Sequence, residues 1–182
     1  MRQEFITLRK GKVDESQADE ILRDVNYFGV MLVQLGLAEG MVSGAIHSTA
    51  DTVRPALQII KTKSGVKRTS GVFLMVKDQH KFVFGDCAIN IEPDAETLAE
   101  IAIQSAETAK NFGIDPKVAM ISYSTKGSGS GPRVDKVVEA TRIAQELRPD
   151  LLIDCELQMD AALVPDTARL KAPGSPVAGQ AN

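Results

Sequence analysis

The last third of the sequence alternates apolar runs with helical patterns, and this alternation limits the fold more than any other feature. Residues 118–122 have the pattern of a buried strand, 133–147 of a helix and 151–153 of a second strand, and a further helix is expected over about 159–171. Two strands joined by a crossover helix pair in parallel. The pattern therefore predicts an α/β fold with a parallel sheet in this part of the chain.

The N-terminal part is dominated by a predicted amphipathic helix. Apolar residues recur near helical spacing over residues 16–35. Either Asp14 or Ser16 is suited to cap its start, and Gly36 is suited to its end. A short strand is then expected at 41–42.

A second helix is predicted over residues 56–61. Pro55 fits the first turn of a helix, and a proline biases the residue before it away from helical geometry. We therefore expect Arg54 to lie at the entrance of this helix rather than inside it.

The middle of the chain predicts a hairpin followed by a long helix. Runs rich in β-forming residues at 71–76 and 81–84 flank the turn-like segment 77–80. Helical spacing returns over 94–112, and Gly113 is expected to close this helix.

Composition indicates a soluble protein and excludes several functions. The 182 residues are 43% hydrophobic and 25% charged, with a formal net charge of -3 and no tryptophan. Such a charge gives no reason to expect nucleic acid or an acidic membrane as a partner. The N-terminus lacks the apolar core of a signal peptide, and no apolar stretch approaches the ~20 residues that span a bilayer. The sequence therefore predicts a cytoplasmic protein.

The cysteines and histidines are isolated from one another. Cys87 and Cys155 form no CxxC pair, and His47 and His80 stand alone, so no metal site is expected. Reduced thiols are favoured over a single disulfide, which the sequence leaves open. The Gly-Asp-Cys sequence that ends at Cys87 suggests a nucleophile. However, its apolar neighbours raise a thiol pKa, which favours a structural role.

Residues 43–54 gather hydroxyl groups and one guanidinium beside a helix start. Such groups form a receptor for phosphate, and a charge-assisted hydrogen bond from Arg54 contributes more than the helix dipole. The alternative is a polar turn in which Asp51 caps the helix and pairs with Arg54. The candidate hydroxyl groups beside the helix start belong to Ser48, Thr49 and Thr52.

Residues 122–131 form a loop of small polar residues between a predicted strand and a predicted helix. Ligands of open parallel sheets bind at this edge of the sheet. The spacing fits neither a Walker loop nor a GxGxxG fingerprint, and the alternative is a flexible crossover loop. The candidate contact residues are Ser124, Thr125, Lys126, Gly127 and Ser128.

Nearly the whole chain resembles the middle of a phosphate acetyltransferase, a member of the phosphate acetyl/butyryl transferase family. The run HSTADTVRPALQIIK is the most specific part of this resemblance. The matching blocks are LRKGK (8–12), DVNYFGVMLVQLGLAEGMVSGAIHSTADTVRPALQIIKTKSGV (24–66), FGDCAINIEPDAETLAEIAIQSAETAKNFGI (84–114), KVAMISYSTKGSGSGPRVDKVVEATRIAQELRPDLLID (117–154) and KAPGSPVAGQAN (171–182).

The resemblance implies a three-layer α/β/α sandwich with a mostly parallel sheet in two lobes, similar to isocitrate and isopropylmalate dehydrogenases. Residues 1–68 would belong to a first, split lobe, and residues 69–182 to a second lobe with the start of the return to the first. The implied enzyme is a homodimer that transfers acetyl reversibly between acetyl-CoA and inorganic phosphate, giving acetyl phosphate and coenzyme A. These are substrates, and no bound cofactor is implied.

The resemblance also implies roles for particular residues. Arg9 and Arg54 match two arginines of the family's site, which grip the phosphates of the coenzyme and the acyl-phosphate side of the cleft. The family's catalytic serine, arginine and aspartate belong to a C-terminal region that lies beyond Asn182, so the chain is expected to be an internal fragment that lacks both ends. Cys155 replaces a usual glycine. The alternative function is a non-catalytic acyl-CoA-binding or assembly module left by truncation.

Overall fold

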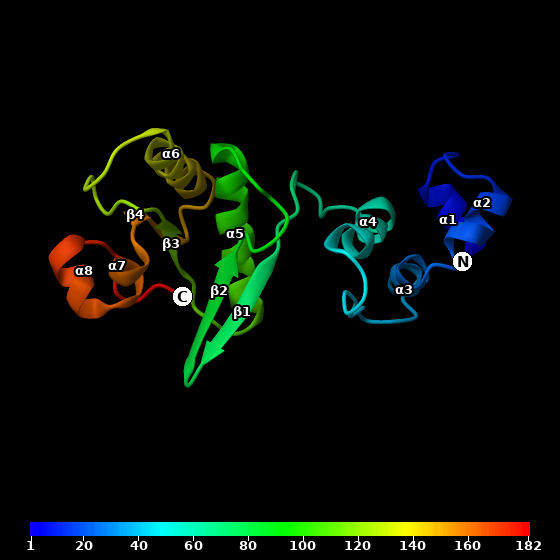
Figure 1. Ribbon diagram of the computed structural model, residues 1–182, viewed down its shortest axis with the longest axis horizontal. Helices are drawn as coiled ribbons and strands as arrows, with labels where there is room; N and C mark the ends of the chain where they lie inside the picture. Colours follow the sequence, from blue (N-terminus) through cyan, green and yellow to red (C-terminus); the bar gives the residue numbers. More distant parts are fainter. The chain divides into compact units, whose positions relative to one another are not determined.

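The computed structural model describes residues 1–182, which divide into two compact units, Met1–Lys67 and Arg68–Asn182 (Figure 1). The protein is a mixed α/β protein. The first unit contains the helices α1 (Arg2–Leu8), α2 (Glu15–Ile21), α3 (Val25–Gln34) and α4 (Thr49–Ile59). The second contains β1 (Val72–Lys77), β2 (His80–Gly85), α5 (Ala95–Asn111), β3 (Lys117–Ile121), α6 (Pro132–Leu147), β4 (Leu152–Leu157), α7 (Met159–Leu163) and α8 (Pro165–Lys171).

The predicted helix over 16–35 is in fact two helices, α2 and α3. Asp14 caps α2, as expected, in a capping box with Gln17. The predicted helix is interrupted at Asp24. The Asp24 carboxylate accepts the N–H groups of Asn26 and Tyr27, so this residue is the N-cap of α3. The apolar positions of the helices meet in a core formed by Phe5, Ala18, Val30, Met31 and Ile59.

Helix α4 begins earlier than predicted, so Arg54 lies inside the helix and not at its entrance. Ser48 is the N-cap, and Pro55 is within the helix. A proline cannot donate to the carbonyl four residues before it. The carbonyl in question, that of Asp51, faces Nδ2 of the buried Asn26 at 3.5 Å, which compensates for part of the loss.

The strand predicted at 41–42 does not form. The first unit contains no strand with which these residues could pair, and Val42 is fully exposed.

The hairpin of the second unit is confirmed. β1 and β2 pair antiparallel, with Val72 opposite Gly85 and Lys77 opposite His80. The turn between them contains two residues, of which Asp78 has a φ of 55°, a left-handed geometry that aspartate tolerates well.

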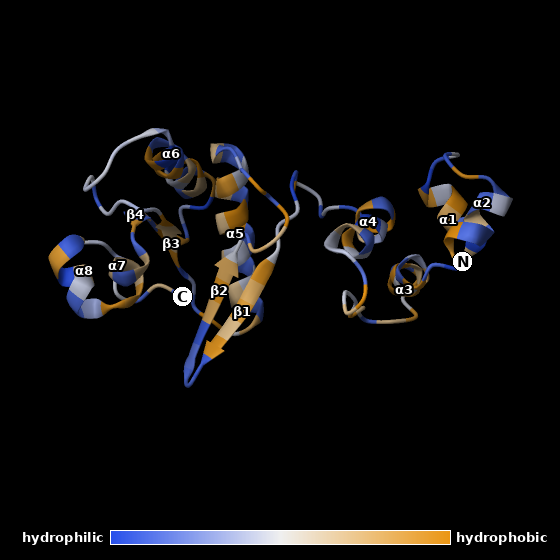
Figure 2. Ribbon diagram, in the orientation of Figure 1, coloured by the Kyte–Doolittle hydropathy of each residue, from blue (hydrophilic) through white to orange (hydrophobic).

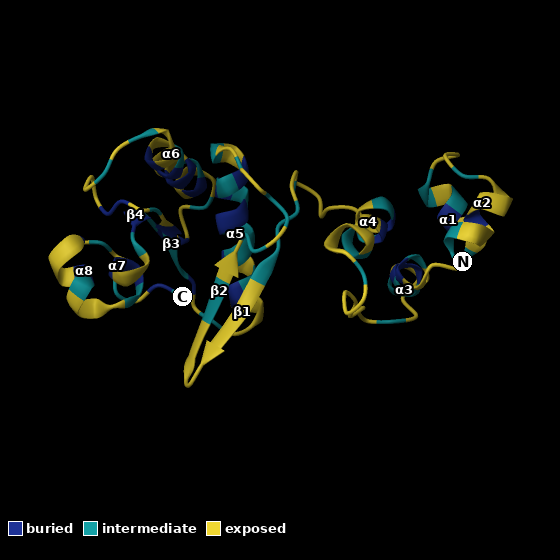
Figure 3. Cartoon of the chain, in the orientation of Figure 1, coloured by how far each residue is buried: buried dark blue, intermediate teal, exposed yellow.

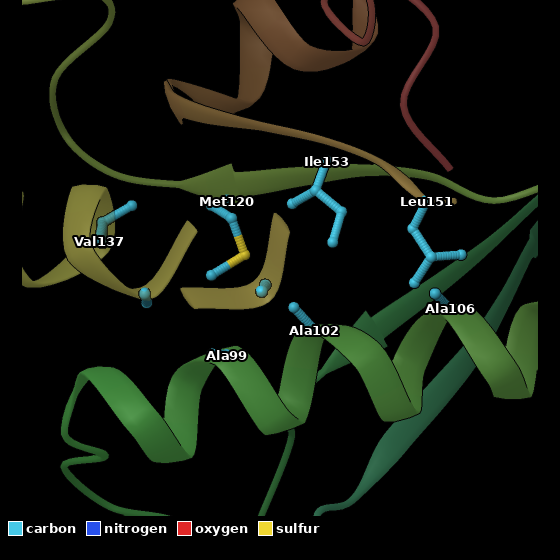
Figure 4. Packing of buried hydrophobic residues seen from close by; sticks show 9 residues of the cluster. Ala99, Ala102, Ala106, Met120, Val137, Leu151 and Ile153 are labelled. Carbon is cyan, nitrogen blue, oxygen red and sulfur yellow. The ribbon is translucent and has the colours of Figure 1, made fainter. Parts of the chain in front are cut away.

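The predicted parallel strands are also confirmed. β3 pairs in parallel with β4, and α6 connects them. The helices α5 and α6 pack against this pair. Small side chains of α5, at Ala99, Ala102 and Ala106, let the helix approach Met120 and Ile153 of the strands (Figure 4). The buried face of α5 is visible in Figure 3.

The helix predicted over 159–171 is interrupted, so α7 and α8 are separate. Pro165 is the first residue of α8, where its missing N–H costs no helical hydrogen bond, and Val164 before it is extended. The strands form two separate sheets, β1-β2 antiparallel and β3-β4 parallel.

Candidate functional site

The start of α4 is a tightly bonded polar turn. The Ser48 hydroxyl accepts the Asp51 N–H at 3.1 Å and donates to the Asp51 carboxylate at 2.7 Å. The Thr52 hydroxyl donates to the Ser48 carbonyl at 3.0 Å. Thr49 is exposed at the first position of the helix. Of the three candidate hydroxyl groups, those of Ser48 and Thr52 are therefore already engaged within the protein.

Arg54 presents its guanidinium to solvent one turn further along α4. Its Nη1 lies 3.6 Å from Oδ1 of Asp51, and its side chain is 56% exposed. An exposed ion pair of this kind contributes only about 0–1 kcal/mol. The pairing with Asp51 considered from the sequence is therefore present, but it is weak enough for an anionic ligand to replace.

Arg9 has an unusual environment for an arginine. It caps the C-terminal end of α1 and is half-buried. Its Nε is buried and has no hydrogen-bond partner. A buried donor without a partner costs free energy. Arg9 and Arg54 both belong to the first unit.

The Ser/Gly loop between β3 and α6 belongs to the second unit and has an inner and an outer side. Ser124 and Thr125 are buried, whereas Lys126, Gly127 and Ser128 are exposed. The Thr125 N–H donates to the Ser128 hydroxyl at 2.9 Å. The loop is therefore folded on its own hydrogen bonds.

Glu156 of β4 forms hydrogen bonds to this loop from its buried side. Its buried carboxylate accepts the Ser124 hydroxyl at 3.0 Å and the Gly127 N–H at 2.6 Å, and its carbonyl accepts the Lys126 N–H at 3.1 Å. Burial alone would raise the pKa of Glu156. The hydrogen bonds from Gly127 and Ser124, with the charge of Lys126, outweigh burial and lower this pKa below its ordinary value. Glu156 is therefore held as an anion beneath the loop.

Asp154 anchors the one cation of the loop. The Lys126 Nζ lies 2.6 Å from Oδ1 of Asp154 and also donates to the carbonyl of Cys155. The hydroxyl of Ser175 donates to the other oxygen of Asp154. The lysine is thus held at the carboxyl edge of the β3-β4 pair with a neutralising partner.

Sequence reasoning did not single out Asp154 and Glu156. Their position in the sequence could have indicated them. Carboxylates near the end of an apolar parallel strand lie at the edge of the sheet where ligands bind. The structure brings the loop residues Ser124–Ser128 together with these two carboxylates.

The remaining groups show no metal or disulfide chemistry. No set of three or more potential ligands is placed to hold a metal ion, and Cys87 and Cys155 are both free. Burial raises the pKa of the Cys155 thiol, which opposes a role as a nucleophile. None of the helices combines the length and apolar character needed to cross a membrane.

The whole chain, residues 1–182, matches the family described as Phosphate acetyl/butaryl transferase, an acyltransferase family. The protein belongs to this family, as the blocks quoted above indicated. It is 61% identical over 180 residues to the phosphate acetyltransferase of Bacillus subtilis (strain 168), and 58% identical over 184 residues to that of Staphylococcus aureus (strain Mu50 / ATCC 700699). Each match covers 99% of this chain and 56% of the relative.

Solved structures agree with the sequence relatives. A phosphotransacetylase from Streptococcus pyogenes is 68% identical, superposes with a TM-score of 0.92 and covers 100% of this chain. The EutD phosphotransacetylase from Staphylococcus aureus is 58% identical, with a TM-score of 0.89 and 99% coverage. This chain spans 56% of the length of both proteins.

Proposed function

We propose that the protein containing this chain is a phosphate acetyltransferase that transfers acetyl reversibly between acetyl-CoA and inorganic phosphate. The observation that carries this proposal is the 61% identity over 180 residues to a protein with that name. No structural observation favours the alternative of a non-catalytic acyl-CoA-binding module. Coenzyme A, acetyl phosphate and phosphate are therefore the proposed ligands, with no bound cofactor.

Arg54 is the proposed contact to a phosphoryl group. Its guanidinium is exposed, and its ion pair with Asp51 is weak. A guanidinium can make two parallel hydrogen bonds to a phosphate, which an ammonium cannot. Thr49 has an exposed side chain at the start of the same helix and is proposed as a further contact, with Ser48 keeping the helix start in shape.

Arg9 is proposed to bind a phosphate of coenzyme A. Its guanidinium carries the charge that suits a phosphate, and the resemblance matches it to an arginine of the family's site. The proposed division of roles therefore assigns the coenzyme to Arg9 and the acyl-phosphate side to Arg54.

The loop of the second unit is proposed to contact the coenzyme through its exposed side. Lys126, Gly127 and Ser128 offer a cation, a backbone without a side chain and a hydroxyl. Ser124 and Thr125 are buried, so their proposed contribution is to fix the loop rather than to touch the ligand. The catalytic residues themselves are proposed to lie outside this chain.

The family relationship supports the remaining expectations. We infer that the complete protein is a cytoplasmic homodimer with a three-layer α/β/α fold related to isocitrate dehydrogenase, in which residues 1–68 and 69–182 belong to two lobes. A single light-scattering measurement of the full-length protein tests the dimer.

The activity is tested with the protein at the full length of its relatives. Acetyl-CoA and phosphate are supplied, and acetyl phosphate and free coenzyme A are measured together. The proposal expects equal amounts of both products and no coenzyme A release without phosphate. Release without acetyl phosphate would indicate a hydrolase, and no release by a folded protein would leave the non-catalytic alternative.

A further inference from the structure

The loop between β3 and α6 uses its own main-chain donors completely. All six N–H groups from Ser124 to Gly129 donate within the protein, two of them to Glu156 and the others within the loop itself. The charge of Lys126 is paired with Asp154 at 2.6 Å. The main chain of these residues therefore has no donor left for a phosphate group, and a different kind of contact has to be considered.

The loop does present the ring of Tyr123 to solvent. This side chain is 57% exposed. Its hydroxyl donates to the Ser130 carbonyl at 2.9 Å, which satisfies the hydroxyl and fixes the direction of the ring. Figure 2 shows the loop mostly in pale colours, of intermediate hydropathy, after the apolar strand β3. The group that Tyr123 still offers to a ligand is therefore its aromatic surface and not its hydroxyl.

Two glycines let this ring lie against the backbone of the loop. A Cβ atom at Gly129 would lie 3.1 Å from Cε2 of Tyr123, and one at Gly131 would lie 3.2 Å from the Tyr123 hydroxyl oxygen. Both distances are shorter than an ordinary van der Waals contact. The loop therefore supports part of the ring, and the rest of its surface is open. A ring that is already fixed in place loses little conformational freedom when a second ring stacks on it.

The position of Tyr123 in the fold is that of a ligand contact. Strand β3 ends at Ile121, so Tyr123 lies just beyond the carboxyl end of a parallel strand. Ligands of open α/β sheets bind at this edge. The next residue, Ser124, is bonded to Glu156 of β4, which fixes the loop relative to the strands. The exposed ring is thus held in one place at the edge of the sheet where a ligand is expected.

We propose that the adenine base of coenzyme A stacks on the ring of Tyr123. This inference rests on the proposed function, which makes the coenzyme a ligand of the protein. Among coenzyme A, acetyl phosphate and phosphate, only the coenzyme carries a flat aromatic ring system. A purine stacks on a tyrosine ring without needing a hydrogen bond from it, which suits a side chain whose hydroxyl is already bonded. The loop therefore recognises the base of the coenzyme through Tyr123.

The alternative is that Tyr123 only fastens the loop to the start of α6 through its hydroxyl. Two variants separate these roles. Tyr123→Phe keeps the ring and removes the hydrogen bond to Ser130, whereas Tyr123→Leu keeps an apolar side chain and removes the ring. Stacking predicts that only the leucine variant binds the coenzyme poorly. A purely structural role of the hydroxyl predicts that both variants are impaired equally.

The variants are measured in the protein at the full length of its relatives, with acetyl-CoA and with acetyl-4′-phosphopantetheine, which lacks the adenosine part. Tyr123→Leu should raise KM for acetyl-CoA about 5- to 150-fold, the range for a base stacked on an aromatic side chain. Its KM for acetyl-4′-phosphopantetheine should change less than twofold, and Tyr123→Phe should restore most of the affinity for acetyl-CoA. Phe112→Leu, which removes a ring that is 54% exposed at the end of α5, is the matched control. Circular dichroism verifies that each variant is folded.

A second measurement does not need turnover. The NMR signals of the Tyr123 ring protons, assigned from their loss in Tyr123→Leu, should shift upfield when coenzyme A is added and should not shift with 4′-phosphopantetheine. The proposal is overturned by equal KM for acetyl-CoA in Tyr123→Leu and wild type, by equal impairment of the leucine and phenylalanine variants, or by ring signals that coenzyme A does not move. Absence of acetyl transfer by the folded wild type would contradict the proposed activity instead, and shifted ring signals would then still support the stacking.

Discussion

Glu156 and Ser124, 32 residues apart in sequence, form a buried hydrogen bond of 3.0 Å between carboxylate and hydroxyl. The same carboxylate accepts the Gly127 N–H at 2.6 Å. A strand residue that faces no solvent therefore fixes the conformation of the exposed loop that the proposed function uses. The loop is therefore fixed to β4 by hydrogen bonds and is not a free crossover segment.

Replacing Glu156 by alanine should lower the free energy of unfolding by about 1–3 kcal/mol, because two donors lose a charged acceptor. Glu156→Gln keeps an acceptor oxygen and should lose less. Urea unfolding measures the difference, and faster hydrogen exchange at the Gly127 amide localises it. Glu146→Ala, at an exposed position of α6, is the control and should change stability by less than about 0.5 kcal/mol. Equal effects of both alanine variants would contradict the assignment.

Asp86 should make the second unit less stable in acid. Burial would raise its pKa, but hydrogen bonds from the N–H groups of Ile89, Ala88 and Asn90 lower it to about 2. The stabilisation by the charged Asp86 is therefore fully present at pH values above the ordinary carboxyl pKa. It is lost as the pH falls through about 2. With allowance for solvent screening, we expect about 1–2 kcal/mol.

Hydrogen exchange at the Ala88 and Ile89 amides measures this effect of Asp86. Protection of these amides from exchange should be greater at pH 6 than at pH 3. Asp86→Asn should remove most of that difference. Asp78→Asn, at the exposed turn, serves as the control. Unchanged pH dependence in Asp86→Asn would show that another group titrates.

Arg54→Ala should lower kcat/KM of the full-length protein by about 30- to 1000-fold, or about 2–4 kcal/mol, the range of one to two charge-assisted hydrogen bonds. Arg54→Lys should restore only part of this, because an ammonium cannot make the bidentate contact. Steady-state kinetics measures both. Arg23→Ala, an exposed arginine of the same unit, should behave as wild type. Near-normal kinetics of Arg54→Ala would remove this residue from the site.

Arg9→Gln should raise KM for coenzyme A or acetyl-CoA more than KM for phosphate or acetyl phosphate, because the proposed contact is to the coenzyme. Glutamine retains some of the packing of the half-buried side chain while it removes the charge. Initial rates with each substrate varied in turn provide the comparison. A change confined to the phosphate side would reverse the roles proposed for Arg9 and Arg54.

The double variant Cys87→Ala and Cys155→Ala should keep most of the activity and lose some stability. Both thiols are free, and burial raises the pKa of Cys155, which disfavours a thiolate nucleophile. Each side chain is partly buried, so its removal leaves space in the packing. Turnover and thermal unfolding are measured together. Complete loss of turnover in a folded variant would indicate an acyl-cysteine step.

Elements with local signals at both ends could be predicted from the sequence. Helix α5 is capped by Asp94 and followed by Gly113 with a φ of 71°, and its predicted range was 94–112. The hairpin and the parallel pair β3-β4 followed from β-rich runs around a short turn and from a crossover helix. In these cases local propensity and tertiary packing agree.

Predictions failed where one residue had two permitted roles. Asp24 is as acceptable on the surface of a helix as at its N-cap, and only the packing of α3 on α4 determines which occurs. Pro55 usually begins a helix, but the buried Asn26 lies near the carbonyl that the proline leaves free. Glu156 was missed because its partners, Ser124 and Gly127, become neighbours only when β3 pairs with β4. Periodicity carries none of this information.

Calorimetric titration of the 182-residue chain with coenzyme A tests most directly the central claim, that residues of this chain recognise the coenzyme. The account predicts saturable binding that weakens at least tenfold in Arg9→Gln, remains as in wild type in Arg23→Ala, and weakens as salt is raised because phosphates are bound by charge. A chain with the circular dichroism of a folded α/β protein that shows no binding, or binding indifferent to Arg9→Gln, would contradict it.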